Sequence, residues 1–99
     1  MRIRITCINK DNGNHANPHE AISRFGWVED GSTQVKHSTL GQMVEFLGNK
    51  LNSAYVSSGN VSALCYINKS AYGNLFIQTY SDNRWQDNLL SLPECKNHA

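Results

Sequence analysis

The first residues of the chain alternate between polar and apolar side chains. Ile3, Ile5 and Cys7 fall on one face of residues 2–8, and the residues between them are polar or charged. Alternation of this kind is typical of a strand with one buried face. The pattern therefore predicts that the side chain of Cys7 is directed into the core.

Five further segments predict short strands. They combine β-branched and aromatic side chains with flanking turn residues such as Gly, Asn, Asp and Ser. These segments are residues 21–28, 33–37, 54–57, 61–68 and 74–80. Asp30–Gly31 and the short turn at 58–60 are typical hairpin connections, so the strands they join are expected to be antiparallel.

One segment, residues 38–51, has helical periodicity. Its apolar residues recur at the spacing of a single helical face. They are Leu40, Met43, Val44, Leu47 and Leu51. Thr39 and Gln42 have the spacing of a capping box, in which each side chain accepts a hydrogen bond from the other residue's backbone N–H.

The order of these elements is β-β-β-α-β-β-β. It predicts one α+β domain over residues 1–99, with an antiparallel sheet of about five to six strands and the amphipathic helix on one face. Residues 81–87 are expected to form a polar loop that contains Trp85. The apolar residues Leu89, Leu90 and Leu92 are expected to close the core as a C-terminal clasp.

Composition narrows the classes of function. Nine basic and eight acidic residues give a net charge of +1, and they form no basic tail of the kind that binds nucleic acid non-specifically. The start of the chain has no apolar leader, and no window reaches the roughly 18 apolar residues of a membrane span. Together with an odd number of cysteines, three, this predicts a cytoplasmic protein with free thiols.

Three short motifs carry a resemblance to a known family. They are Ile-Thr-Cys-Ile-Asn-Lys at residues 5–10, Pro-His-Glu at 18–20 and Asn-Leu-Leu-Ser-Leu-Pro-Glu-Cys at 88–95. With the hairpin and helix between them, they resemble the small bacterial proteins grouped as domain-of-unknown-function family thirty-eight ninety-two. The resemblance spans essentially the whole chain and implies a compact bacterial or phage-borne domain. It implies no activity.

Two cysteines and a histidine are candidate metal ligands. Cys7, His19 and Cys95 offer the thiolate and imidazole groups that zinc binds, although the paired spacings of common zinc motifs are absent. Further candidates for a fourth ligand are His15, His37 and His98. In the alternative interpretation, Cys7 is a small apolar core residue and Cys95 a tail thiol. A clasp that brings Cys95 close to Cys7 would favour the metal site.

The sequence contains none of the usual catalytic constellations. A catalytic thiol needs an electropositive, partly exposed setting, but Cys7 and Cys65 lie on predicted buried faces and Cys95 follows an acidic residue. A glycine-rich phosphate loop and a nucleophile elbow are both missing. The sequence therefore predicts a non-enzymatic domain without a cofactor, unless it binds zinc.

Aromatic residues near turns indicate recognition of another protein or self-association. Trp85, Arg84, Tyr72 and Trp27 lie near predicted turns or strand ends, and Trp and Arg are frequent in binding hot spots. Trp27 has the alternative role of a core or rim residue. An uncovered edge strand would also be able to pair with a partner or a second copy of the chain.

A nucleic-acid-binding module is a third alternative. Basic and aromatic side chains on an open sheet face combine charge with stacking surfaces. The candidate residues are Arg2, Arg4, Arg24, Lys36, Trp27, Tyr55, Tyr66 and Tyr72. The balanced charge of the chain weighs against this function.

Overall fold

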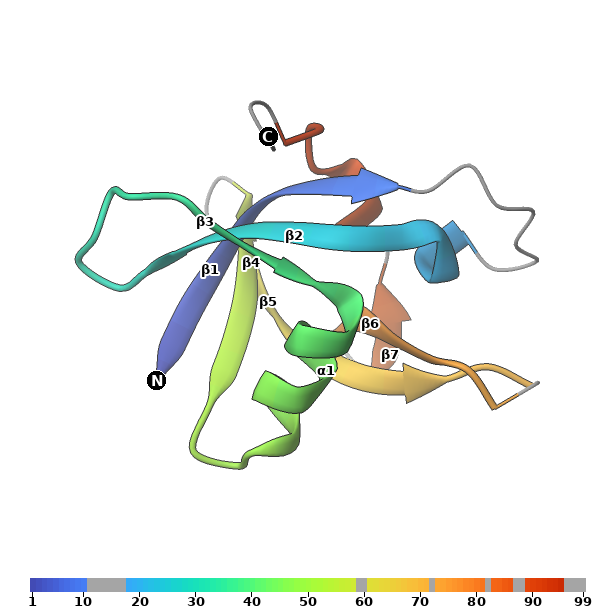
Figure 1. The fold of residues 1–99 in the computed structure, drawn as a ribbon. Coiled ribbons are helices and arrows are strands. Elements are labelled where there is room, and N and C mark those ends of the chain that lie inside the picture. The colour runs from blue at the N-terminus through green and yellow to red at the C-terminus, as the bar shows by residue number, and fades with distance from the viewer. Residues whose placement is uncertain (11–17, 59–60, 72, 82, 87–88, 96–99) are drawn as a thin grey trace.

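The computed structural model describes residues 1–10, 18–58, 61–71, 73–81, 83–86 and 89–95 (Figure 1). Within these ranges the chain forms strands, one α-helix and two 3-10 turns. The strands are β1 (Arg2–Lys10), β2 (Ile22–Glu29), β3 (Lys36–Thr39), β4 (Ser53–Ser58), β5 (Val61–Lys69), β6 (Leu75–Ser81) and β7 (Arg84–Gln86). The helix α1 spans Leu40–Gly48, and the turns η1 and η2 span Pro18–Ala21 and Leu89–Ser91.

The strands form one seven-stranded mixed sheet in the order β3-β2-β1-β4-β5-β6-β7. The α+β class is as predicted, but the wholly antiparallel sheet of five to six strands is not, because β1 and β4 are parallel. The helix α1 carries the chain from the edge strand β3 back to the centre of the sheet, where β4 enters beside β1 in the same direction. The additional strand is β7, which lies in the segment expected to be a polar loop.

Strand β7 forms because the chain turns tightly after β6. Asn83 has a φ of 64°, a left-handed conformation that Asn adopts more readily than most residues. The turn places Tyr80 opposite Trp85 and Ser81 opposite Arg84 in an antiparallel pair. The polar residues beside Trp85 therefore belong to a hairpin rather than to a loop.

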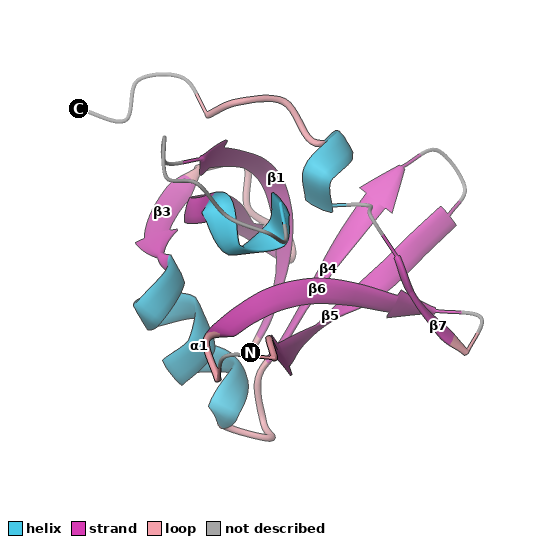
Figure 2. Cartoon of the chain, turned by 90° about the vertical axis from the view of Figure 1, so that its right-hand side faces the viewer, coloured by secondary structure: helices cyan, strands magenta, loops and turns pink. Residues whose placement is uncertain are grey.

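The sheet curls so that its two arms face each other across the core (Figure 2). On one arm β2 and β3 contact α1, and on the other β5 and β6 contact it, so the helix closes one end of the interior. The buried cluster at the centre consists of Ile3, Ile5, Ile8, Ile22, Phe25, Met43, Ala54, Val56, Cys65, Ile77 and Leu89. Both arms of the sheet, the helix and the C-terminal tail contribute to this core.

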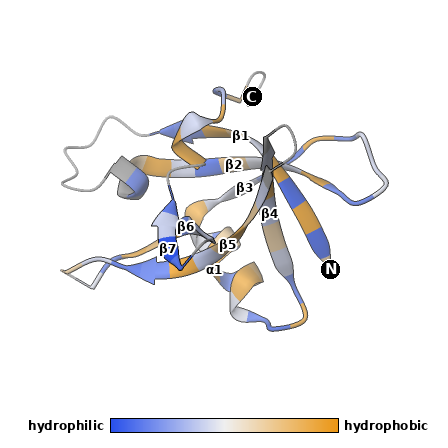
Figure 3. Ribbon diagram, turned by 180° about the vertical axis from the view of Figure 1, so that it is seen from behind, coloured by the Kyte–Doolittle hydropathy of each residue, from blue (hydrophilic) through white to orange (hydrophobic). Residues whose placement is uncertain are grey.

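Strand β1 keeps the predicted alternation only in its first half, where hydrophilic and hydrophobic bands follow one another along the ribbon (Figure 3). Ile5 pairs with Trp27 but Cys7 pairs with Gly26, so β1 accommodates one extra residue at this point. A bulge of this kind shifts the alternation by one residue. Ile8 is therefore buried in the core, and the prediction that Cys7 is directed into the core is wrong.

The helix begins with the predicted capping box. The N–H of Gln42 donates to Oγ1 of Thr39 (3.2 Å), and the N–H of Thr39 donates to Oε1 of Gln42 (2.8 Å). The helix is shorter than the predicted 38–51 because it ends at Gly48, after which Asn49 is extended. Leu51 consequently lies outside the helical stripe and is 84% exposed. No helix in the described part of the chain is long and apolar enough to span a membrane.

The C-terminal tail docks along the second half of β1. Leu89 is fully buried, and the other two leucines of the tail pack against the core. The N–H of Ile8 donates to the carbonyl of Pro93 (3.0 Å), and the N–H of Cys95 donates to the carbonyl of Ile8 (3.1 Å). The predicted C-terminal clasp is therefore confirmed, and it holds Cys95 beside β1.

Candidate functional site

Three residues on adjacent strands lie in one row across the sheet. Cys7 of β1 pairs with Gly26 of β2, which pairs in turn with His37 of the edge strand β3. Residues that are directly opposite on neighbouring strands direct their side chains to the same face. Cys95 lies next to Cys7 on the other side of β1, where the tail forms a parallel bridge between Glu94 and Ile8.

Cys7 and Cys95 form a disulfide, with their Cα atoms 4.9 Å apart and a sequence separation of 88. The expectation of free thiols is therefore wrong for these two cysteines. The two cysteines meet because the tail docks against β1. The expectation of free thiols rested on the odd number of cysteines, which gives no information about such a contact. Cys65 is free and buried in the core, where burial raises the pKa of its thiol to about 12 and keeps it protonated.

The lack of a side chain at Gly26 makes room for the two sulfur atoms. A Cβ added at this position would lie 2.9 Å from Sγ of Cys95 and closer still to Sγ of Cys7. Real Cβ atoms essentially never approach other atoms within 3.0 Å. A closed disulfide therefore requires glycine in the middle of β2, although glycine weakens a strand interior.

Replacing Gly26 with alanine should destabilise the domain by about 1–3 kcal/mol, a typical cost of overpacking a filled site. Because the clash involves only sulfur atoms, the same replacement should cost much less in a Cys7→Ala/Cys95→Ala background. Urea unfolding of the wild type, Gly26→Ala, Cys7→Ala/Cys95→Ala and the triple variant gives the cost of the glycine replacement in each background. Equal costs in both backgrounds would mean that the sulfur atoms are not the reason for glycine at this position.

His37 lies close to both sulfur atoms. Sγ of Cys7, Sγ of Cys95 and a ring nitrogen of His37 all lie within 4.8 Å of one another. Cys95 is buried, Cys7 is half-buried and His37 is exposed, so the group is open to solvent on the β3 side. The three side chains are of the types that bind zinc through sulfur and nitrogen.

His19 lies in a different part of the molecule. It is buried in η1, and its ring centroid is 6.2 Å from that of Phe76 on β6. The structure thus brings Cys7 and Cys95 together, but the histidine beside them is His37, which was predicted only as a further ligand. The other two histidines, at positions 15 and 98, lie outside the described residues.

Exposed aromatic rings form a second surface, on the β5-β6-β7 end of the sheet. Leu64 pairs with Tyr80, and Tyr80 pairs with Trp85, so the three residues follow one line across three strands. The ring centroids of Tyr80 and Trp85 are 5.1 Å apart and those of Tyr66 and Tyr80 are 6.3 Å apart, both in edge-to-face contact. Trp85 is 42% exposed, Tyr66 45% and Tyr80 38%. We refer to Leu64, Tyr66, Tyr80 and Trp85 as the aromatic ladder.

The four residues predicted to bind a protein do not form one surface in the described part of the structure. Trp85 and Arg84 both lie exposed on β7. Trp27 packs against the core from β2, and its Nε1 donates to Oγ of a neighbouring serine on β3 (2.9 Å). Tyr72 lies outside the described residues. Tyr66 was predicted on the open sheet face but not beside Trp85, because β7 was not expected as a strand.

Two of the cations considered for nucleic-acid binding lie beside acidic groups. Nε of Arg2 is 3.8 Å from a carboxylate oxygen of Asp30, and the guanidinium also lies over the ring of Tyr55, 4.4 Å from its centroid. Nζ of Lys36 is 3.3 Å from Oε1 of Glu29. These contacts neutralise part of the positive charge on the β1-β2-β3 surface.

Comparison with known proteins identifies the family. A family model described as Protein of unknown function (DUF3892) matches residues 4–93. The chain belongs to this family. The family resemblance read from the sequence is thereby confirmed, and the matched part of the domain includes Cys7, Gly26 and His37 and ends two residues before Cys95. No curated protein and no solved structure gives a significant match to the chain.

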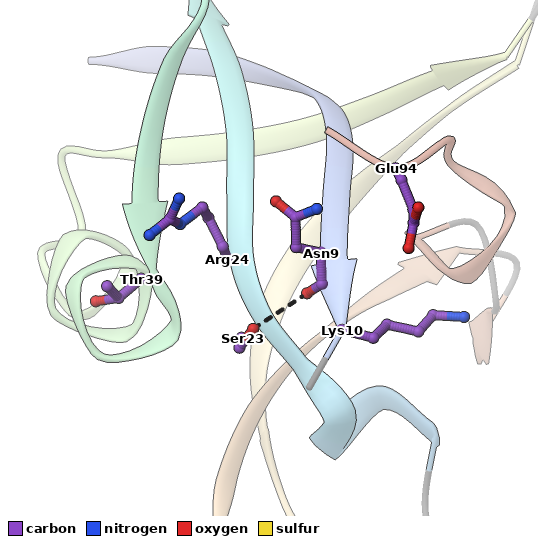
Figure 4. Close-up of a pocket in the computed structure, with 6 residues that line it drawn as sticks. All are labelled: Asn9, Lys10, Ser23, Arg24, Thr39 and Glu94. Carbon is purple, nitrogen blue, oxygen red and sulfur yellow. Dashed lines mark hydrogen bonds between the residues drawn. The ribbon is translucent and has the colours of Figure 1, made fainter. Parts of the chain in front are cut away.

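A polar pocket of about 630 Å³ lies beside the tail of this DUF3892 domain (Figure 4). Its lining residues are Asn9, Lys10, Ser23, Arg24, Thr39 and Glu94. The hydroxyl of Ser23 donates to the carbonyl of Asn9 (3.4 Å). The basic side chains diverge, with Arg24 extending towards β3 and Lys10 away from it, so they do not converge on one bound group. The cysteine–histidine group is therefore the better candidate for a small ligand.

Proposed function

We propose that the domain is a non-enzymatic protein-binding module and that the aromatic ladder is its recognition surface. One observation supports this above all others. The ring of Tyr80 contacts those of Tyr66 and Trp85 edge-to-face, while each of the three residues remains more than a third exposed. Tyr and Trp offer a large contact area at a small cost in side-chain entropy, and they are enriched in the hot spots of protein interfaces.

The position of the ladder at the sheet edge supports a specific mode of binding. β7 is the last strand in the sheet order, and the ladder ends on it at Trp85. An extended segment of a partner that paired with β7 would place one of its side chains next to Trp85 and continue the ladder. Main-chain hydrogen bonds would supply affinity, and the aromatic rings would select apolar side chains in the partner.

The charge distribution supports a protein ligand over a nucleic acid. The net charge is +1, and the cations Arg2 and Lys36 lie beside carboxylates. Nucleic-acid binding depends on several cations that neutralise phosphates together. Arg84 and Trp85 are consecutive exposed residues of β7, and both residue types are frequent in protein hot spots.

Replacing Trp85 with alanine should weaken binding of a ladder-directed peptide at least about tenfold, because hot-spot tryptophans typically contribute about 2 kcal/mol or more. The probe is a library of random linear peptides displayed on phage and selected on the purified wild-type domain. Fluorescence polarisation then gives the Kd of each selected peptide for wild type, for Trp85→Ala and for Tyr80→Ala. Both variants should bind the selected peptides more weakly.

Leu51→Ala is the matched control, because Leu51 is an exposed apolar residue outside the ladder. It should bind the peptides like wild type, and all variants should keep nearly the wild-type melting temperature, since exposed side chains contribute little to stability. Native mass spectrometry tests whether the partner is a second copy, which would give a dimer that Trp85→Ala removes. Selection of only those peptides that bind wild type and Trp85→Ala equally would contradict the proposed surface.

A further inference from the structure

We propose that reduction of the Cys7–Cys95 disulfide converts this site into a zinc site, with Cys7, Cys95 and His37 as its three protein ligands. The proposal rests on geometry, because Sγ of each cysteine and a ring nitrogen of the histidine lie within 4.8 Å of one another. It does not depend on the aromatic ladder, which lies on the other arm of the sheet.

Small movements separate the present arrangement from tetrahedral coordination. A Zn–S bond of about 2.3 Å and a tetrahedral angle place two thiolate ligands roughly 3.7 Å apart. The sulfur atoms must therefore move apart once their bond is broken, while the histidine nitrogen is already within 4.8 Å of both. Gly26 contributes the space for this, since it has no side chain between Cys7 on one neighbouring strand and His37 on the other.

The chemistry balances with a dithiol as the reductant. The dithiol transfers two electrons and two protons, the S–S bond breaks to give two thiols, and the reductant becomes a disulfide. Zn²⁺ then displaces both thiol protons into solvent and accepts a lone pair from the neutral imidazole. Two thiolates and one divalent cation leave no net charge at the half-buried site, and water occupies the fourth position.

The disulfide and the zinc site are alternative links between the tail and β1. Each would join Cys95 to Cys7 and so hold the tail against β1. The backbone hydrogen bonds donated by the N–H groups of Ile8 and Cys95 hold the same segment in place. Asn9 supports the same arrangement, since its Nδ2 donates to the carbonyl of Cys95 (3.3 Å). In a reducing compartment, such as the cytoplasm that the sequence predicts, the zinc form would be favoured because disulfides are rare there.

The test is titration of Zn²⁺ into the domain after reduction with a dithiol and removal of the reductant under nitrogen. Isothermal calorimetry and native mass spectrometry should both give one zinc per chain for the reduced protein and none for the oxidised protein. Cys7→Ser and Cys95→Ser should lose binding. His37→Ala should bind more than about tenfold more weakly, since even outer-shell changes at metal sites typically cost 10–100-fold.

Cys65→Ala is the matched control, because it removes a cysteine that lies in the core away from the site. It should bind zinc like wild type. Cobalt(II) provides a second measurement on the unmodified chain, since two thiolate ligands in tetrahedral geometry give intense sulfur-to-metal charge-transfer and d–d absorption. Any of three results would overturn the proposal: no zinc uptake by the reduced wild type, equal affinity of His37→Ala and wild type, or a cobalt spectrum without thiolate bands.

Discussion

Loss of the Cys7–Cys95 disulfide should lower the free energy of unfolding by about 2–5 kcal/mol, the usual range for a native disulfide in a small domain. The bond closes a loop of nearly the whole chain, because its ends have a sequence separation of 88. In the chain-entropy model a loop of that length restricts the unfolded chain by about 4–5 kcal/mol. The melting temperature should therefore fall by roughly 10 °C or more for a domain of this size.

Thermal and urea unfolding of the oxidised and reduced protein, both in the presence of a chelator, measure this difference. The chelator matters because bound zinc would restore part of the stability of the reduced form. A Cys7→Ala/Cys95→Ala variant should unfold at the same midpoint with or without reductant. Cys65→Ala is the control and should retain the full effect of the reductant. Identical midpoints for oxidised and reduced wild type would contradict a stabilising disulfide.

Replacing Leu89 with alanine should cost about 2–5 kcal/mol, the range observed for buried leucines. Leu89 is fully buried within the core cluster, yet it belongs to the C-terminal tail. The loss combines the transfer energy of the missing methyl groups with the cavity left between the tail and the sheet. Urea unfolding of the oxidised protein gives the value directly.

Leu51→Ala makes the same chemical change at a position that is 84% exposed, so it should shift the free energy of unfolding by less than about 0.5 kcal/mol. The double variant Leu89→Ala/Cys95→Ser should lose less stability than the sum of the two single losses. Both changes weaken the docking of the same tail. Once one of them has released the tail, the contact removed by the other no longer stabilises the folded state, so its loss adds little. A loss for Leu89→Ala as small as that for Leu51→Ala would mean that the clasp is not closed in solution.

Local patterns in the sequence predicted much of the secondary structure and part of the core. The capping box at Thr39 and Gln42, the buried Met43 and the docked leucines of the tail are all as expected. The patterns that indicated these features each lie within a few positions of the sequence, as a capping pair, a helical stripe or a short apolar run. The limits of the helix were less accurate, because Gly48 and Asn49 ended it before Leu51.

The site was predicted only in part, because its residues come from four separated segments. The metal interpretation named Cys7 and Cys95 as ligands on the condition that the clasp brings them together, and the tail does place Cys95 against Cys7. It preferred His19, whereas the register of β2 and β3 places His37 opposite Gly26. A tight turn at Asp30–Gly31 would have paired Gly26 with the residue at position 35 instead. The longer connection between β2 and β3 sets the register, and no local pattern indicated its length.

The sequence alone determined the approximate positions of the strands other than β7, where the helix begins, that the tail closes the core and to which family the chain belongs. These properties follow from side-chain periodicity and short motifs. The tertiary structure decided that Cys7 faces outward, that β1 and β4 are parallel, that Cys7, Gly26 and His37 share one row, and that Cys95 lies against Cys7. A single extra residue in β1 reverses the face of every later side chain in the strand, and pairing between distant strands sets which residues meet.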